Sequence, residues 1–353
     1  MARDFEEGYL GGVAGYVLAG LYGALASLDR RRKLAGRRIR PGLPVLSIGN
    51  LTTGGTGKTP LTVWAARELV ARGIPVAIVA RDCGGPVPRA ASDEAAVHAE
   101  LVPEALVLAG RSKARLAARA ASMLAAAAGA PADSTGGRAR GCVLVDDAFS
   151  HPALVRDLDL VLVDARRPLG NAHLLPRGPL REPPQALARA DAIVVTRADL
   201  IAPALLDGVL GALGRLAPQA LLATGRHHLL GVAPAGGAQA PAPPPPGQAA
   251  VCLSGLARRG ELARAARGLG LNVVADLCYP DHHRFREGEW RRALAEARLH
   301  GAWLLVSRKD AVRLGSDARR ECHVLEVAFE PLREGERLVD LITRAAQGPL
   351  RPS

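Results

Sequence analysis

A glycine-rich turn constrains the fold of this chain more than any other feature. Residues 54–59 read Gly-Gly-Thr-Gly-Lys-Thr, between an apolar run at 43–48 and a helix-like stretch at 61–72. Strand, glycine-rich turn and helix in this order are typical of a phosphate-binding loop, because backbone N–H groups surround the anion and the helix N-terminus adds its dipole. The pattern indicates a nucleoside triphosphate site in an α/β fold.

Each residue type in the turn has a chemical reason to be there. The glycines let N–H groups point inward, Lys58 can reach the outer phosphates, and the Thr59 hydroxyl can ligate a phosphate-bound Mg²⁺. Thr52 stands where such loops usually have their first glycine. The alternative, a glycine-rich turn with an incidental Gly-Lys-Thr, is less favoured because of the flanking strand and helix. The predicted phosphate-binding residues are Gly54, Gly55, Thr56, Gly57, Lys58 and Thr59.

Composition limits the kinds of partner. A net charge of +12 over 353 residues suggests an anionic partner: nucleic acid, acidic lipid or a phosphorylated substrate. Aromatic residues make up only 3% of the chain, which weakens the case for base stacking on single-stranded nucleic acid. The five cysteines are dispersed and form no Cys-x-x-Cys pair. That argues against a disulfide framework or a zinc site and fits a reducing cytoplasm.

The N-terminal region has the pattern of a membrane-associated segment. Residues 9–28 carry no charge and are long enough to span a bilayer, but five glycines make them only weakly apolar, so a helix in the membrane interface fits equally well. The next segment, 29–40, holds seven basic residues and one acid. A basic run directly after an apolar helix indicates a cytoplasmic position against anionic lipid. The alternatives are a buried core helix and a solvated basic face.

Two later apolar runs end in charged side chains. The run 142–145 leads into Asp146 and Asp147, and the run 74–80 leads into Arg81. Ligands of open α/β sheets bind at the carboxyl ends of the strands. An acid in this position, downstream of a phosphate-binding loop, is typical of a carboxylate near a phosphate-bound Mg²⁺.

Two further segments carry charged residues that suggest nucleotide chemistry. The Pro- and Gly-rich segment 170–183 places Arg181 beside Glu182, which we interpret as a phosphate clamp and metal partner; a surface ion pair is the alternative. The tetrad at 196–199, Thr-Arg-Ala-Asp, loosely resembles the guanine-reading loop of GTPases. It leaves open a P-loop GTPase or metallochaperone-type switch.

A proline-rich stretch at 232–248 is the best candidate for a domain boundary, because proline runs form semi-rigid spacers. Beyond it lies a smaller α/β unit whose segment 279–283 reads Tyr-Pro-Asp-His-His. A histidine oriented by a carboxylate suits a general base, although the motif alone favours a plain loop. The predicted division is a membrane-associated helix and basic segment (1–40), a P-loop NTPase-like domain with a mostly parallel sheet flanked by helices (41–231), a linker (232–248) and the smaller α/β domain (249–353).

Taken together, these motifs resemble the tetraacyldisaccharide 4′-kinase family, the lipid A 4′-kinases of Gram-negative bacteria. The strongest matches are the segments 49–60 and 170–183, and the segments 279–283 and 309–310 match as well. The resemblance runs from the N-terminal apolar helix nearly to the C-terminus. In this family the loop also has threonine at the position of Thr52, where other phosphate-binding loops have their first glycine.

The resemblance implies a lipid kinase that uses ATP and Mg²⁺ to phosphorylate the 4′-hydroxyl of a tetraacylated glucosamine disaccharide 1-phosphate. It implies a site at the cytoplasmic face of the inner membrane, with peripheral or single-helix attachment. The expected partners are the lipid and the anionic membrane surface, with neither nucleic acid nor an obligate protein partner. The implied residues are Lys58, Asp93, Asp281 and His282 for catalysis, Thr59, Asp146, Asp147 and Glu182 for the cation, and Arg81, Arg111, Lys113 and Arg181 for charge on phosphate.

Two segments depart from the family pattern. Arg-Gly-Tyr-Gly-Gly is replaced at 81–85 by Arg-Asp-Cys-Gly-Gly, and Asp-Asp-Gly-x-Gln-His has Ala148 and Ser150 in place of its Gly and Gln. Asp82 adds negative charge near the phosphates, and the changes at 148 and 150 are expected to reshape the metal loop. They leave open a membrane-bound binding protein whose catalysis has decayed.

Overall fold

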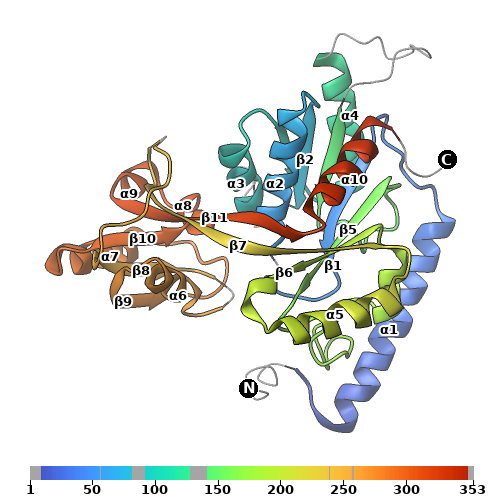
Figure 1. The fold of residues 1–353 in the computed structure, drawn as a ribbon, viewed down its shortest axis with the longest axis horizontal. Helices are drawn as coiled ribbons and strands as arrows, with labels where there is room; N and C mark the ends of the chain where they lie inside the picture. The colour runs from blue at the N-terminus through green and yellow to red at the C-terminus, as the bar shows by residue number, and fades with distance from the viewer. Residues whose placement is uncertain are drawn as a thin grey trace. The chain divides into compact units, whose positions relative to one another are not determined.

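The computed structural model describes residues 9–55, 57–81, 92–127, 141–237, 239–256 and 258–348. The chain forms two compact units (Figure 1). The first comprises Met1–Arg226 and Phe329–Ser353, and the second comprises His227–Ala328. Strand β7 (Leu221–Pro234) leads from the first unit into the second, and β11 (Cys322–Arg333) leads back. The second unit is therefore an insertion into the first.

The first unit is built on a parallel sheet. Its other strands are β1 (Val45–Asn50), β2 (Val76–Arg81), β3 (Leu106–Gly110), β4 (Cys142–Asp146), β5 (Leu158–Asp164) and β6 (Ala192–Thr196). They lie in the order β3-β2-β4-β1-β5-β6, with the start of β7 beside β6. Ile48 of β1 pairs with Asp146 of β4, so the turn after β1 and the acids after β4 meet at one edge of the sheet.

Helices cover both faces of this sheet. They are α2 (Lys58–Ala71), α3 (Asp93–Leu101), α4 (Lys113–Ala127), α5 (Pro203–Leu216) and α10 (Gly335–Gln347). Leu46 of β1 belongs to the apolar cluster that includes Leu61 of α2 and Leu338 of α10. Its neighbour Val45 belongs to a different cluster, with Ala117 of α4. Because successive strand residues point to opposite faces, a strand buried on both sides reads as a continuous apolar run, as the sequence showed.

The second unit is a smaller α/β arrangement. Parallel strands β8 (Ala249–Ser254), β9 (Asn272–Cys278) and β10 (Trp303–Ser307) lie with β11 in the order β11-β10-β8-β9. Its helices are α6 (Glu261–Gly268), α7 (Glu287–Leu299), α8 (Arg308–Ala311) and α9 (Ser316–Arg320). Two apolar clusters, one with Ala293 of α7 and one with Leu262 of α6, share the strands β8 and β10 between them.

The division into units differs from the one expected at the proline-rich stretch. Residues 232–248 lie inside the second unit, where Val232 and Ala242 exchange backbone hydrogen bonds of 2.9 and 3.1 Å. Helix α10, assigned by sequence to the smaller domain, belongs to the first unit and lies against α2 (Figure 1). The physical reason is apolar burial, since Leu338 and Ile342 complete the cluster under β1.

The predicted N-terminal helix is present as α1 (Gly12–Ala35). By length and composition it could cross a membrane, a test that core helices and signal sequences also pass. Only 11% of the most apolar 18-residue stretch of α1 is buried, which argues against the alternative of a core helix. Its exposed large apolar residues are Val13, Tyr16, Val17, Leu18, Leu21, Leu25, Leu28 and Leu34.

Candidate active site

The glycine-rich turn has the backbone geometry that its sequence predicts. Gly54 and Gly57 have φ angles of 106° and 87°, in the left-handed region that favours glycine. A Cβ atom at Gly55 would meet nothing within 4 Å, so the turn faces open space. Gly57 is the N-cap of α2, and Lys58 and Thr59 are its first two residues. The turn is therefore shaped to receive an anion at a helix N-terminus. Thr56 lies outside the described residues.

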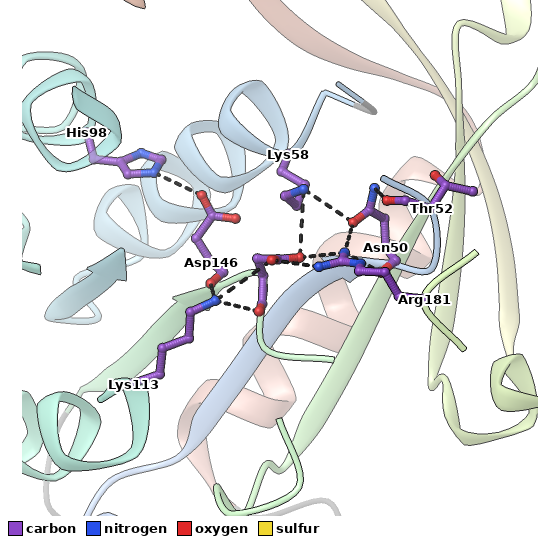
Figure 2. A network of polar contacts seen from close by, with 8 residues as sticks. Asn50, Thr52, Lys58, His98, Lys113, Asp146 and Arg181 are labelled. Atoms are coloured by element: carbon purple, nitrogen blue, oxygen red, sulfur yellow. Dashed lines mark hydrogen bonds and ion pairs between the residues drawn. The ribbon is translucent and has the colours of Figure 1, made fainter. Parts of the chain in front are cut away.

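Lys58 lies within a network of polar contacts at the carboxyl ends of β1 and β4 (Figure 2). Its Nζ donates a 3.2 Å hydrogen bond to Asn50 Oδ1 and lies 3.7 Å from Asp147 Oδ1. The ammonium group is thus held beside the glycine-rich turn by an amide and a carboxylate.

Arg181 is the main partner of Asp147. Its guanidinium donates to both carboxylate oxygens, at 2.9 and 2.8 Å, and also to the carbonyl of Asn50 at 2.8 Å. Burial raises the pKa of the Asp147 carboxyl, but the hydrogen bonds from Arg181 and the charges of Lys58, Arg181 and Lys113 outweigh it and hold that pKa well below its usual range. Asp147 is therefore ionised at neutral pH.

Lys113 holds the backbone of the same loop. Its buried Nζ donates to the carbonyl of Asp146 at 2.7 Å and to that of Asp147, and it lies 4.0 Å from Asp147 Oδ2. Ala148 stands where the family has glycine, and its φ angle is not positive. The residue with a positive φ in this loop is Asp147, at 57°. The described backbone therefore does not require glycine at position 148.

Asp146 contacts a histidine that the sequence reasoning did not single out. The carboxylate is 1% exposed, and its Oδ2 lies 3.5 Å from Nε2 of His98, at the outer limit of hydrogen bonding (Figure 2). Burial raises the pKa of Asp146, whereas the contact with His98 and the charges of His98 and Lys58 bring it below its ordinary value. His98 is one of four polar residues among the nine of α3, so nothing in the sequence alone distinguishes it.

The charge and burial of Asp146 fit a role in binding a cation. Within the described part of the chain, neither of its oxygens has a hydrogen-bond partner of normal geometry, which is unusual for a buried carboxylate. No group of three or more His, Cys, Asp or Glu side chains that could hold a metal is present among the described residues. Mg²⁺ is commonly held by one or two carboxylates together with substrate phosphates rather than by an all-protein cage, and this donor set suits that arrangement.

Glu182 connects α1 to the rest of the first unit. Its carboxylate lies 3.3 Å from Arg30 of α1 and 2.9 Å from Arg189, while Tyr22 of α1 donates to the carbonyl of Arg181 at 3.4 Å. The neighbouring Arg181 faces Asp147, as described above. Residues 181 and 182 therefore link α1 to the polar network around Lys58.

The remaining predicted residues of the first unit lie at element ends. Asp93 is the first residue of α3, whose N-cap Ser92 accepts a 3.3 Å hydrogen bond from the Ala95 amide. Arg111 is exposed between β3 and α4. Arg81 is the last residue of β2, and its side chain lies outside what the structure describes. Residues 82–91, which include the first departure from the family pattern, also lie outside the described residues.

Asp281 and His282 form a separate cluster in the second unit. His282 has φ 60°, its Nε2 lies 3.9 Å from Asp281 Oδ2, and each side chain is 44% exposed. Its Nδ1 lies 3.2 Å from Nη2 of Arg313. Arg313 in turn donates to Asp310 at 3.0 Å and to the carbonyl of Gly255 at 3.1 Å. His282 thus rests on a buried ion pair while its ring reaches solvent.

Asp310, the acid of the Lys-Asp pair at 309–310, is held by buried contacts. It is 0% exposed, and it accepts from Ser307 Oγ at 2.5 Å and from the Gly255 amide at 3.1 Å. Burial raises its pKa, against the opposing effects of the Ser307 hydrogen bond and the Arg313 charge. Asp310 thus connects the backbone of Gly255 to Arg313, the residue that contacts His282.

Arg197, in the tetrad at 196–199, makes two structural contacts. Arg197 has φ 57°, donates to Asp164 at 2.8 Å and donates to the carbonyl of Gly55 in the glycine-rich turn at 3.3 Å. Arg197 therefore braces the phosphate-binding loop, and these contacts account for the arginine of the tetrad.

A parallel sheet, a glycine-rich turn opening a helix with Lys-Thr, and acids at the end of the adjacent strand define a P-loop nucleoside triphosphate-binding protein. Comparison with known proteins narrows this class. The family model LpxK, tetraacyldisaccharide-1-P 4′-kinase, matches residues 13–347. A tetraacyldisaccharide 4′-kinase of Anaeromyxobacter dehalogenans (strain 2CP-C) is 41% identical over 296 residues, covering 78% of this chain and 73% of that protein.

A second relative, from Gluconacetobacter diazotrophicus, is 36% identical over 324 residues and covers 90% of this chain and 91% of its own. The crystal structure of LpxK from Aquifex aeolicus in complex with ATP shares the fold, with a TM-score of 0.67 and 22% identity over 94% of this chain and 98% of that one. The chain belongs to the tetraacyldisaccharide 4′-kinase family. The resemblance, the fold class and the assignment as a kinase are confirmed, and the GTPase or metallochaperone-type switch is not favoured.

Proposed function

We propose that the protein transfers the γ-phosphate of ATP to the 4′-hydroxyl of a tetraacylated glucosamine disaccharide 1-phosphate, a step in lipid A biosynthesis. The observation that carries the proposal is the family match across residues 13–347, together with a glycine-rich turn whose Lys58 is held beside it by Asn50 and Asp147. The decayed binding protein has less support, because Lys58, Thr59, Asp146 and Asp147 are all present.

The first unit would bind the triphosphate. Lys58 and the amides of the turn would take the phosphates, and Arg181 would offset charge as it develops on the transferred group. Thr59 and Asp146 would hold Mg²⁺, with Asp147 and Glu182 as further candidates; when bound, the cation neutralises charge on the phosphate oxygens. Lys113 would keep the loop of Asp146 in place through its two carbonyl contacts.

The acceptor hydroxyl needs a group that takes its proton. Asp93, at the start of α3, and His282, with Asp281 beside it, are the proposed residues. Since Nδ1 of His282 lies 3.2 Å from an Arg313 nitrogen that always carries hydrogen, Nδ1 is the acceptor in that contact. The proton of a neutral His282 would then sit on Nε2, which leaves that ring no free lone pair, so Asp93 is the residue proposed to take the hydroxyl proton.

The assay that tests this function uses purified protein, Mg²⁺, γ-labelled ATP and the tetraacyl disaccharide 1-phosphate in detergent. Label should appear in a bisphosphorylated lipid. Lys58→Ala should lower the rate by about 10³-fold or more, because the phosphate charge then lacks its cation. The variant should keep the circular dichroism of wild type. Hydrolysis of ATP without labelled lipid would contradict the proposal.

We also infer that α1 attaches the protein to the cytoplasmic face of the inner membrane, peripherally or as a single anchor. Exposed leucines on α1 supply apolar surface and the basic run 30–40 supplies attraction to anionic lipid. Deleting α1 is a poor test, because Tyr22 and Arg30 contact the segment that carries Arg181 and Glu182.

Replacing three exposed leucines of α1 with glutamine tests the attachment cleanly. The triple variant at Leu18, Leu21 and Leu25 should sediment less with phosphatidylglycerol vesicles, and what binding remains should be more sensitive to salt. Leu299→Gln, at an exposed leucine of α7, is the matched control and should sediment like wild type. Equal sedimentation of the triple variant and wild type would overturn the inference.

A further inference from the structure

His98 is a buried polar side chain to which the proposed reaction assigns no role. It lies in α3 and is 0% exposed, and within the described residues neither ring nitrogen has a hydrogen-bond partner of normal geometry. The polar group facing it is the Asp146 carboxylate, 3.5 Å from Nε2. An imidazole buried without hydrogen bonds is unfavourable, so apolar packing alone does not account for a histidine here.

The backbones on both sides of this contact are fixed. Helix α3 starts at its Ser92 cap, and Ala95 and Val97 are buried beside His98. The backbone of Asp146 is paired with β1 at Ile48 and is held by the Lys113 ammonium. What these contacts leave free is the rotation of the Asp146 side chain, and His98 is the group placed to set it.

We propose that His98 is a positioning residue for Asp146, donating its Nε2–H to Oδ2 and so fixing the orientation in which this carboxylate binds the phosphate-associated cation. The inference rests on the proposed function only in taking Asp146 as a cation ligand. Carboxylates that bind metals are themselves usually hydrogen-bonded, and these outer partners tune metal affinity. A hydrogen bond that is long without nucleotide can shorten in the complex.

The test compares two substitutions of similar size. His98→Leu keeps the bulk and removes the N–H donor, whereas His98→Gln keeps a donor on its amide. Calorimetry measures ATP binding across a Mg²⁺ series and in EDTA, with no lipid present. Val97→Ala is the matched control, because it opens a cavity in the same helix and leaves the contact between His98 and Asp146 in place.

We expect His98→Leu to raise the Mg²⁺ concentration for half-maximal ATP binding by about 10- to 100-fold, the range typical of lost partners of metal ligands. ATP affinity in EDTA should stay unchanged. His98→Gln should recover most of the effect, and Val97→Ala should lower thermal stability without changing the Mg²⁺ dependence. A His98→Leu protein with wild-type Mg²⁺ dependence, or a His98→Gln protein as impaired as His98→Leu, would overturn the proposal.

Two design points keep the result decisive. If His98→Leu does not fold, His98→Asn replaces it, since its shorter amide cannot span the gap to Asp146. Equal Mg²⁺ dependence of the Asn and Gln variants would then overturn the inference. ATP binding is measured without lipid. A wild-type enzyme that is inactive in the lipid assay would therefore count against the proposed function, while the role of His98 would still be decided by the Mg²⁺ dependence of ATP binding.

Discussion

The two polar clusters, one in each unit, are built in opposite ways. In the first unit, Asp147 is ringed by Arg181, Lys58 and Lys113, so the cations near the glycine-rich turn already have an anion among them. In the second unit the ion pair of Asp310 and Arg313 is buried, and His282 above it is 44% exposed. The cations of the first cluster can therefore exchange part of their interaction with Asp147 for one with an incoming phosphate. The second cluster fixes the position of one exposed imidazole, that of His282.

The largest effect on the difference between the two clusters is expected from removing Arg313, the buried cation beneath His282 in the second unit. Arg313→Ala leaves the Asp310 carboxylate buried without its cation, and losing one partner of a buried ion pair costs about 3–5 kcal/mol. Hydrogen exchange should show the loss in the second unit, while ATP affinity measured by calorimetry stays close to wild type.

Arg320→Ala is the control for Arg313→Ala, since Arg320 pairs with Asp317 on the exposed surface of the same unit. Surface pairs contribute roughly 0–1 kcal/mol, so this variant should be nearly neutral. If Arg313→Ala abolished ATP binding, the two clusters would not be independent of each other.

A smaller effect is expected in the first unit from Asp147→Asn. The amide keeps the shape and removes the charge that Arg181 and Lys58 share, which should lower stability at pH 7 by about 1–2 kcal/mol, given that the side chain is 22% exposed. Because the folded pKa of Asp147 lies below its ordinary value, its contribution is present above that value and is lost as the pH falls through the folded pKa.

Urea unfolding of wild type and Asp147→Asn should therefore differ most at neutral pH, and the difference should begin to shrink below pH about 4, where the unfolded carboxyl binds its proton. Asp207→Asn, at an exposed acid paired with Arg333, is the control and should show little difference at either pH. A gap between wild type and Asp147→Asn that persists unchanged at pH 3 would show that shape, not charge, explains the loss.

Local patterns in the sequence were enough to predict the sheet strands and the glycine-rich turn. The apolar run before Gly54 and the acids Asp146 and Asp147 are contiguous signals, and the structure has strands β1 and β4 there. Arg181 remains a predicted phosphate-binding residue, and its bidentate contact with Asp147 joins residues that lie 34 positions apart in the chain.

What the sequence did not reveal depends on contacts between distant segments. His98 looks like any polar residue of a short helix until Asp146 is placed opposite it. The proline-rich stretch suggested a boundary because proline stiffens a chain locally, whereas the unit to which α10 belongs is decided by where Leu338 finds apolar neighbours. Burial of that kind cannot be read from adjacent residues.

The insertion of the second unit has a consequence for how the chain matures during synthesis. Ribosomes deliver α10 last, after all of residues 227–328 have emerged, yet Leu338 and Ile342 of α10 help to close the apolar cluster beneath the glycine-rich turn. The nucleotide-binding unit therefore cannot complete its core while the second unit is being made. Until α10 has been synthesised, the apolar surface that it covers in the finished protein lacks that cover, so we expect the first unit to reach its full stability only after the second unit has been made.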